Sequence, residues 1–160
     1  AVSVIITLAI GCTLKKKDTV AEGSAAQVTE TTGSDSSDAS ASANKISLAD
    51  DYSDNEATCT STSDGVYACK AKGFGLINNM GSDYSENEVE VTVENGTVKA
   101  VKLVNFGDTA NIGELATTDE ALAAYEGATA DSEVDAVSGA TFTSKSVASM
   151  VKAALESAAE

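Results

Sequence analysis

The segment best suited to chemistry lies just before the last predicted helix and reads DAVSGATFTS over residues 135–144. It combines hydroxyl side chains with Gly139 and Ala140, whose small size lets a bulky group approach the backbone. A helix N-terminus attracts phosphate through its free N–H groups and its positive dipole end. Lys145 adds a cation that opposes this dipole unless an anion is present. The pattern indicates a candidate phosphate site, although a loop that only caps a helix has a similar composition.

The composition excludes most other catalytic machinery. The 160 residues carry a net charge of -15 and include no His, Arg, Trp or Pro. Without His there is no Ser-His-Asp or Cys-His triad, no His general base and no His-ligated metal, so we expect no metal site. The negative field repels nucleic acid, so we expect no nucleic-acid partner. A bound cofactor is then the better source of demanding chemistry, which leaves a cofactor carrier, a binding module or an inert surface protein.

The first residues are typical of an export signal. Residues 1–10 are uncharged and apolar, but they are too few to span a bilayer, which takes about 20 residues. The small residues before Cys12 resemble a bacterial lipoprotein cleavage box, although Ala9 stands where such a box usually has Leu. We therefore expect residues 1–17 to be a truncated signal segment and Cys12 to be lipidated. The alternative is a buried Cys in an apolar strand.

Residues 18–57 are predicted to be a disordered acidic tether rich in Ser, Ala and Thr. They contain few large apolar side chains, so they bury too little surface to offset their ordering entropy. Ile46, Leu48 and Tyr52 form a weak apolar cluster that could dock on a domain or form one short turn. Residues 58–160 are then expected to be the folded domain.

The clearest local pattern is a β-hairpin in the middle of the chain. Apolar residues alternate up to Val93, Asn95-Gly96 is a strong hairpin turn, and a second strand runs to Val104. Simple register pairs Val93 with Val98 and Val91 with Ala100, and a later shift of the apolar phase predicts a bulge near Lys99-Ala100.

An earlier hairpin is predicted around a three-residue loop at residues 63–65. In that register Thr62 pairs with Val66, and Cys59 lies opposite Cys69, close enough for a disulfide. Two independent thiols are the alternative. The following segment, Gly73–Ile77, is apolar and flanked by glycines, which indicates either close approach of a ligand or simply a bulge or strand end.

Two helices complete the predicted elements. Thr117 as N-cap and Glu120 three residues on predict a short helix over 118–126. A second helix over 144–158 presents one apolar face, formed by Val147, Met150, Val151, Ala154, Leu155 and Ala158. The sequence therefore predicts an α+β domain, in which a short middle helix and a C-terminal helix pack on a small antiparallel sheet.

The motif Asp135-x-x-Ser138-Gly139-Ala140-Thr141-x-Thr143 resembles the flavinylation motif of FMN-binding domains. Such domains occur in the C subunit of the Na+-pumping NADH:quinone reductase, in the G subunit of the Rnf complex and in flavin-bearing electron-transfer lipoproteins. The segment 64–75 and the hairpin ending at Val104 are similar to the family's opening strand and central hairpin. The loop 108–113 stands where the family carries a Glu-Thr-Pro-Gly-Leu-Gly-like sequence; here Asp108 replaces Glu and Ala110 replaces Pro.

The resemblance implies a role for each matched residue. Thr141 would be joined to FMN as a phosphoester by a separate flavin transferase that uses FAD, and Asp135 would be read by that enzyme or fix the turn. Ser138, Gly139 and Ala140 would shape the backbone around the phosphate, and Thr143 and Ser144 would bond it or cap the helix. Two further segments would border the isoalloxazine ring, contributing Gly73, Phe74 and Gly75 from one and Asp108, Thr109 and Gly113 from the other.

The implied function is an extracytoplasmic flavoprotein, held on the outer face of the cytoplasmic membrane by Cys12. It would relay electrons between a membrane donor and an external acceptor or partner flavoprotein, as a carrier rather than a stand-alone enzyme. One alternative is a peripheral FMN-bearing subunit of an Rnf-like membrane oxidoreductase. Another is a non-redox surface lipoprotein that binds a partner or ligand.

Overall fold

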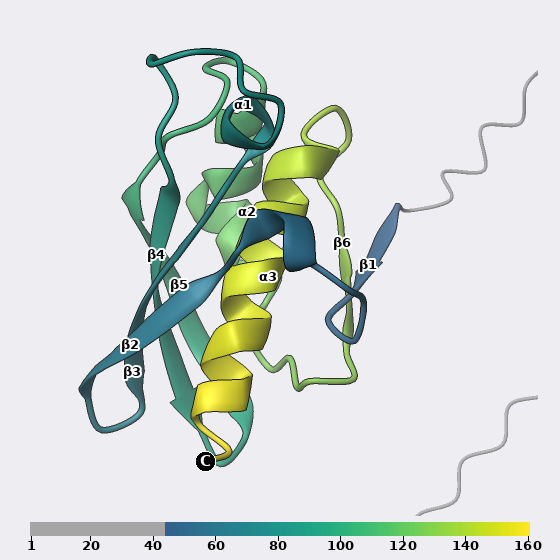
Figure 1. Ribbon diagram of the computed structural model, residues 1–160. Coiled ribbons are helices and arrows are strands. Elements are labelled where there is room, and N and C mark those ends of the chain that lie inside the picture. Colours follow the sequence, from purple (N-terminus) through teal and green to yellow (C-terminus); the bar gives the residue numbers. More distant parts are fainter. Residues whose placement is uncertain (1–43) are drawn as a thin grey trace, which may run out of the picture. The chain divides into compact units, whose positions relative to one another are not determined.

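The computed structural model describes residues 44–160, and the predictions for the signal segment and Cys12 lie outside this range. None of its helices is long and apolar enough to cross a bilayer. In chain order (Figure 1) the elements are β1 (Lys45–Ser47), η1 (Ser53–Asn55), β2 (Thr58–Ser63), β3 (Val66–Ala71), α1 (Phe74–Ile77), β4 (Asn87–Glu94), β5 (Thr97–Asn105), η2 (Gly113–Thr117), α2 (Asp119–Ala123), β6 (Glu133–Asp135) and α3 (Thr141–Ser157).

An antiparallel sheet in the order β2-β3-β4-β5 forms one layer, and α3 packs on it as the second layer (Figure 1). A separate two-stranded sheet pairs β1 with β6. The core lies between sheet and helix, where every second residue of β4 meets the apolar face of α3. This arrangement confirms the predicted α+β class. The fully buried side chains of this core include Val89, Val91, Val98, Val147, Met150 and Val151.

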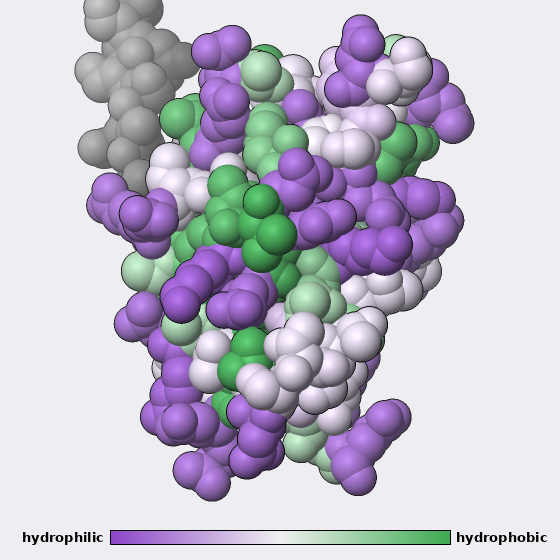
Figure 2. Space-filling view, turned by 90° about the vertical axis from the view of Figure 1, so that its left-hand side faces the viewer, coloured by the Kyte–Doolittle hydropathy of each residue, from purple (hydrophilic) through white to green (hydrophobic). Residues whose placement is uncertain are grey.

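The face shown in Figure 2 is mostly hydrophilic. Figure 2 shows polar side chains over most of one face, with apolar ones gathered near its centre. Single exposed apolar side chains are normal on a protein surface, but a cluster of large ones around a hollow is informative. The large apolar residues exposed in the described part are Met80, Leu103, Val104, Ile112, Leu115 and Phe142.

The hairpin of β4 and β5 confirms the predicted strands, turn and bulge. Val93 pairs with Val98, as expected. The extra residue is Lys99, so Ala100 already pairs with Thr92, and Val91 pairs with Val101 instead of Ala100. The bulge thus corrects the apolar phase at once and points Val101 toward the core.

The hairpin of β2 and β3 brings Cys59 opposite Cys69, and the structure joins them in a disulfide with Cα atoms 4.1 Å apart. The loop is shorter than predicted. Ser63 pairs with Val66 across the two-residue turn Asp64-Gly65, and the register shifts between Ser61 and Ser63. That shift restores the expected pairing of the two cysteines.

The helices begin at positions other than those predicted. Helix α3 starts at Thr141, because the Ser144 N–H already donates to the Ala140 carbonyl. The N-cap of α2 is Thr118, whose hydroxyl accepts from the Ala121 N–H, whereas Thr117 donates to Glu114 in the preceding 3-10 turn.

Two smaller predictions also need correction. Gly73–Ile77 was expected to be a bulge or strand end, and its last four residues form the one-turn helix α1. Ala158 follows the end of α3 and is exposed instead of buried.

The predicted tether extends too far toward the domain. Ile46 and Leu48 are only 4% and 0% exposed, and β1 pairs with β6. Asn55 exchanges two hydrogen bonds with the backbone of Lys72, which fastens the same segment beside β3. The domain therefore includes residues 45–57, because these few apolar side chains complete its core.

Replacement of Leu48 by Ala tests this boundary. Leu48 is fully buried, so Leu48→Ala should lower the free energy of unfolding by about 2–5 kcal/mol. Leu115→Ala, at a leucine that is half exposed, is the matched control and should cost clearly less. Urea unfolding followed by circular dichroism measures both changes in free energy. Equal effects would mean that residues 45–57 are not part of the folded domain.

Candidate functional site

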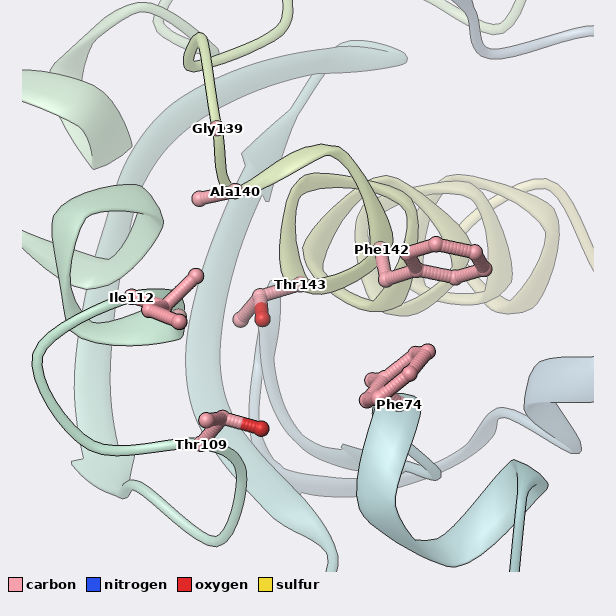
Figure 3. A pocket seen from close by; sticks show the side chains of 8 residues that line it. Phe74, Thr109, Ile112, Gly139, Ala140, Phe142 and Thr143 are labelled. Carbon is pink, nitrogen blue, oxygen red and sulfur yellow. The ribbon is translucent and has the colours of Figure 1, made fainter.

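A pocket of about 250 Å³ opens where three segments meet near the N-terminus of α3 (Figure 3). Helix α1 forms one wall and the loop after β5 forms a second. The third wall consists of the turn before α3 and the first residues of α3. Its lining is mainly apolar and includes two threonine hydroxyls. The lining residues are Phe74, Thr109, Ile112, Gly113, Gly139, Ala140, Phe142 and Thr143.

A single carboxylate, Asp108, joins these three walls from behind. One oxygen, Oδ2, accepts from the Phe74 N–H at 2.9 Å and from the Thr143 hydroxyl at 2.8 Å. The other, Oδ1, accepts from the N–H groups of Gly75 and Thr109 at 3.2 and 2.9 Å. The side chain is buried, at 8% exposure. Hydrogen bonds to a charged group are stronger than neutral ones, so Asp108 holds α1, its own loop and α3 in fixed relation.

Asp108 also explains why α1 forms. The N-cap residue of this short helix is Gly73, which has no side chain to cap it. The Asp108 carboxylate takes over this function from a distant part of the chain by binding the first two N–H groups. A Cβ at residue 73 would collide with Asp108 and with the Asn87 side chain, so the close approach requires glycine.

Asn87 supports the same region from the sheet. Its fully buried amide accepts from the Gly107 N–H at 3.0 Å and donates to the Ser146 hydroxyl at 3.1 Å. These bonds tie the loop before Asp108 to β4 and to α3. The sequence analysis did not single out Asn87, and a polar residue at a core-facing strand position was the available signal.

The turn Val137–Ala140 leads into α3. Its third residue, Gly139, has φ +84°, a conformation that favours glycine. The Ser144 hydroxyl accepts from the Val137 N–H at 3.1 Å, and the Tyr125 hydroxyl donates to the Ser144 carbonyl. The turn is thus held by hydrogen bonds to Ser144, while Ser138 and Gly139 lie exposed.

Thr141 is the first residue of α3 and is partly exposed. It is not among the pocket-lining residues; the Asn44 amide reaches its hydroxyl at 3.5 Å. Two residues on, Thr143 is buried and committed to Asp108. Asp135, at the end of β6, is exposed and forms an ion pair with Lys45 of β1 at 2.9 Å.

Two lining residues were missed by the sequence analysis. Phe142 packs against Phe74, with ring centroids 4.9 Å apart and a tilt of 57°, and Figure 3 shows the two rings side by side at one end of the pocket. Ile112 lies opposite them. Ile112 and Phe142 are each slightly over half exposed. The available signal for Phe142 was a large apolar side chain off the buried stripe of α3.

The structure gathers the predicted cofactor residues into three groups. Those that line the pocket are Phe74, Thr109, Gly113, Gly139, Ala140 and Thr143. Those directly behind the lining are Gly73, Gly75 and Asp108. Those along the leading turn and first turn of α3, outside the lining, are Asp135, Ser138, Thr141 and Ser144.

The Asp108 network makes stability depend on pH in a defined direction. Burial acts to raise the pKa of Asp108, but hydrogen bonds from Thr143, Phe74, Gly75 and Thr109 outweigh it, and the pKa lies below its ordinary value. A carboxyl with a lowered folded pKa stabilises the fold above its unfolded pKa, which is about 3.9 for Asp, and loses this effect as pH falls through the folded pKa.

The pH prediction compares wild type with Asp108→Asn. The difference in their free energies of unfolding should be constant between about pH 5 and 7 and should shrink below about pH 4, since the wild-type carboxyl becomes neutral there. Urea unfolding across this range measures it. A difference that grew in acid would contradict the assignment.

One comparison with known proteins finds a family match. Residues 84–156 match the model of the FMN-binding domain. The match begins before β4 and ends within α3, so it includes Asn87, Asp108 and the motif before α3, while α1 lies outside it. No curated protein and no solved structure matches the chain. Over residues 84–156 the chain is therefore similar to the FMN-binding domain, a family of flavin-binding domains.

Proposed function

We propose that this domain carries FMN as a phosphoester on the Thr141 hydroxyl and relays electrons as an extracytoplasmic, lipid-anchored carrier. The observation that carries the proposal is the partly exposed Thr141 beside an apolar pocket whose walls meet at the N-terminus of α3. A flavin transferase that uses FAD must reach the acceptor hydroxyl. Thr141 meets this requirement, whereas the neighbouring Thr143 is buried and bonded to Asp108.

The lining suits the ring of a flavin. Phe74, Phe142 and Ile112 provide apolar contacts for a flat aromatic group, and Thr109 and Thr143 add polar atoms that can orient its edge. The volume of about 250 Å³ lies at the small end for ligand pockets, which suits part of a cofactor better than a whole one. The phosphate at Thr141 would then lie outside the pocket and the ring within it.

The helix terminus suits the phosphate. The first residues of α3 offer free N–H groups at a positive dipole end. Lys145 lies four residues after Thr141, on the same side of the helix. It forms no ion pair with any residue of 44–160, although five other lysines there do. Its charge is therefore available to a phosphodiester on Thr141.

The bound flavin would supply reversible electron transfer, and the chain would supply attachment, partial burial and charge. The net charge of -15 would steer partners with basic surfaces, either a membrane donor or an external acceptor flavoprotein. Anchoring by a lipid on Cys12 would hold this exchange on the outer face of the cytoplasmic membrane.

Flavin attachment can be tested by coexpression with a flavin transferase and export. The peptide that spans residues 138–145 should gain the mass of an FMN phosphoester, and Thr141→Ala should abolish the gain. Thr60→Ala, which removes an exposed hydroxyl of β2 outside the motif, is the control and should leave the gain intact. Mass mapping that put the flavin on Thr143, or a wild type without flavin, would refute the assignment.

Lipid anchoring is tested separately, with the chain expressed behind a complete export signal. Cys12→Ala should move the protein from the membrane to the soluble fraction and abolish labelling by a fatty acid. Cys59→Ser, which removes a disulfide sulfur instead of the lipid acceptor, is the control and should remain in the membrane fraction. Membrane retention of the Cys12 variant would show that another feature holds the chain there.

A further inference from the structure

We propose that Asp108 sets the reduction potential of the bound flavin, by placing a buried negative charge behind the two threonines of the pocket wall. This inference rests on the proposed function. It assigns Asp108 as a positioning residue that acts on the flavin through Thr143 and Thr109, and it does not require direct contact with the flavin.

The hydrogen bonds around Asp108 suit an ionised carboxylate. Each carboxylate oxygen accepts from at least two donors, and every partner in the described part of the chain is an N–H or a hydroxyl. The three N–H groups can only donate and the two hydroxyls can donate as well, so a carboxylate accepts all of these contacts. The geometry therefore fits the carboxylate form.

No cation balances this charge within residues 44–160. The lysines that form ion pairs there lie on β1, β3 and β5 and just after β3, and each pairs with a carboxylate other than Asp108. The charge is offset only by the N–H and hydroxyl dipoles that point at it. Because the site is buried, its field is screened less than that of a surface carboxylate.

The two threonines carry this field to the pocket. Thr143 donates its hydroxyl hydrogen to Asp108 at 2.8 Å, and Thr109 approaches the same carboxylate at 3.4 Å. Both residues also line the pocket. A hydroxyl that has given its hydrogen to Asp108 can only accept from a ligand, so the wall presents lone pairs and a nearby negative charge. Such a wall opposes added electron density on a flavin ring and lowers its midpoint potential.

The experiment is a reductive titration with dithionite and redox dyes on flavin-loaded protein. Dithionite supplies the electrons, and water supplies any proton that the flavin takes up. Asp108→Asn removes the charge with little change of shape and should give a midpoint potential more positive than wild type. Asp108→Glu keeps the charge and should remain close to wild type.

Two further variants separate charge from loosened structure. Thr143→Val breaks the shortest hydrogen bond to Asp108 and removes one acceptor from the wall but keeps the charge, so the potential should rise less than in Asp108→Asn. Glu94→Gln removes a surface charge at the far end of β4 and should leave the potential unchanged. At strand spacing, the seven residues from Asn87 to Glu94 span about 23 Å. This last variant corrects for the loss of one net charge.

The outcomes distinguish this inference from the proposed function. Two results with flavin-loaded protein would overturn the role of the charge and leave the carrier function standing. One is an unchanged potential in Asp108→Asn, and the other is a rise in Thr143→Val as large as that in Asp108→Asn. If Asp108→Asn does not fold, a large shift of the potential in Asp108→Glu, which keeps the charge, overturns the inference alone. A wild type that takes up no flavin would overturn both.

Discussion

The pocket depends on one buried carboxylate that receives hydrogen bonds from three separate parts of the chain. Asp108 caps the short helix α1, closes its own loop and fixes the first turn of α3 through Thr143. The position of each segment depends on the others. Helix α1, for example, has no side-chain cap of its own. The hydrogen bonds are short-range and directional, so they define the walls more sharply than apolar packing alone.

This arrangement separates two tasks along one helix. The apolar face of α3 closes the core against the sheet, while its first turn serves the site. Thr141 and Thr143 are only two residues apart, yet one is partly exposed and the other is buried against Asp108. Successive helix positions point in different directions, so a single turn can offer one hydroxyl to an approaching enzyme and use the next to hold the wall.

The elements with strong local patterns were predictable from sequence. Val93 opposite Val98, the bulge at Lys99 and the apolar stripe of α3 follow from periodicity and from the Asn95-Gly96 turn. The cap of α2 was missed by one residue, because two neighbouring threonines could each cap it, and the start of α3 was missed by three, because no side chain caps that helix at all. Helix α1 and the buried segment around Leu48 were not predictable in this way, since both depend on contacts with residues far along the chain. Likewise, motif resemblance alone led to Asp108, and only the fold shows that it works from behind the wall.

The pairing of β1 with β6 has a mechanical consequence. It brings Asn44 within 3.5 Å of the Thr141 hydroxyl, so the described chain enters the domain beside the proposed attachment point. Any group joined to the Thr141 hydroxyl would therefore lie beside the point where residues 44–160 meet the preceding chain. Such a group would also compete with the Asn44 amide for that hydroxyl oxygen, so attachment would loosen the contact between the entry of the chain and the start of α3.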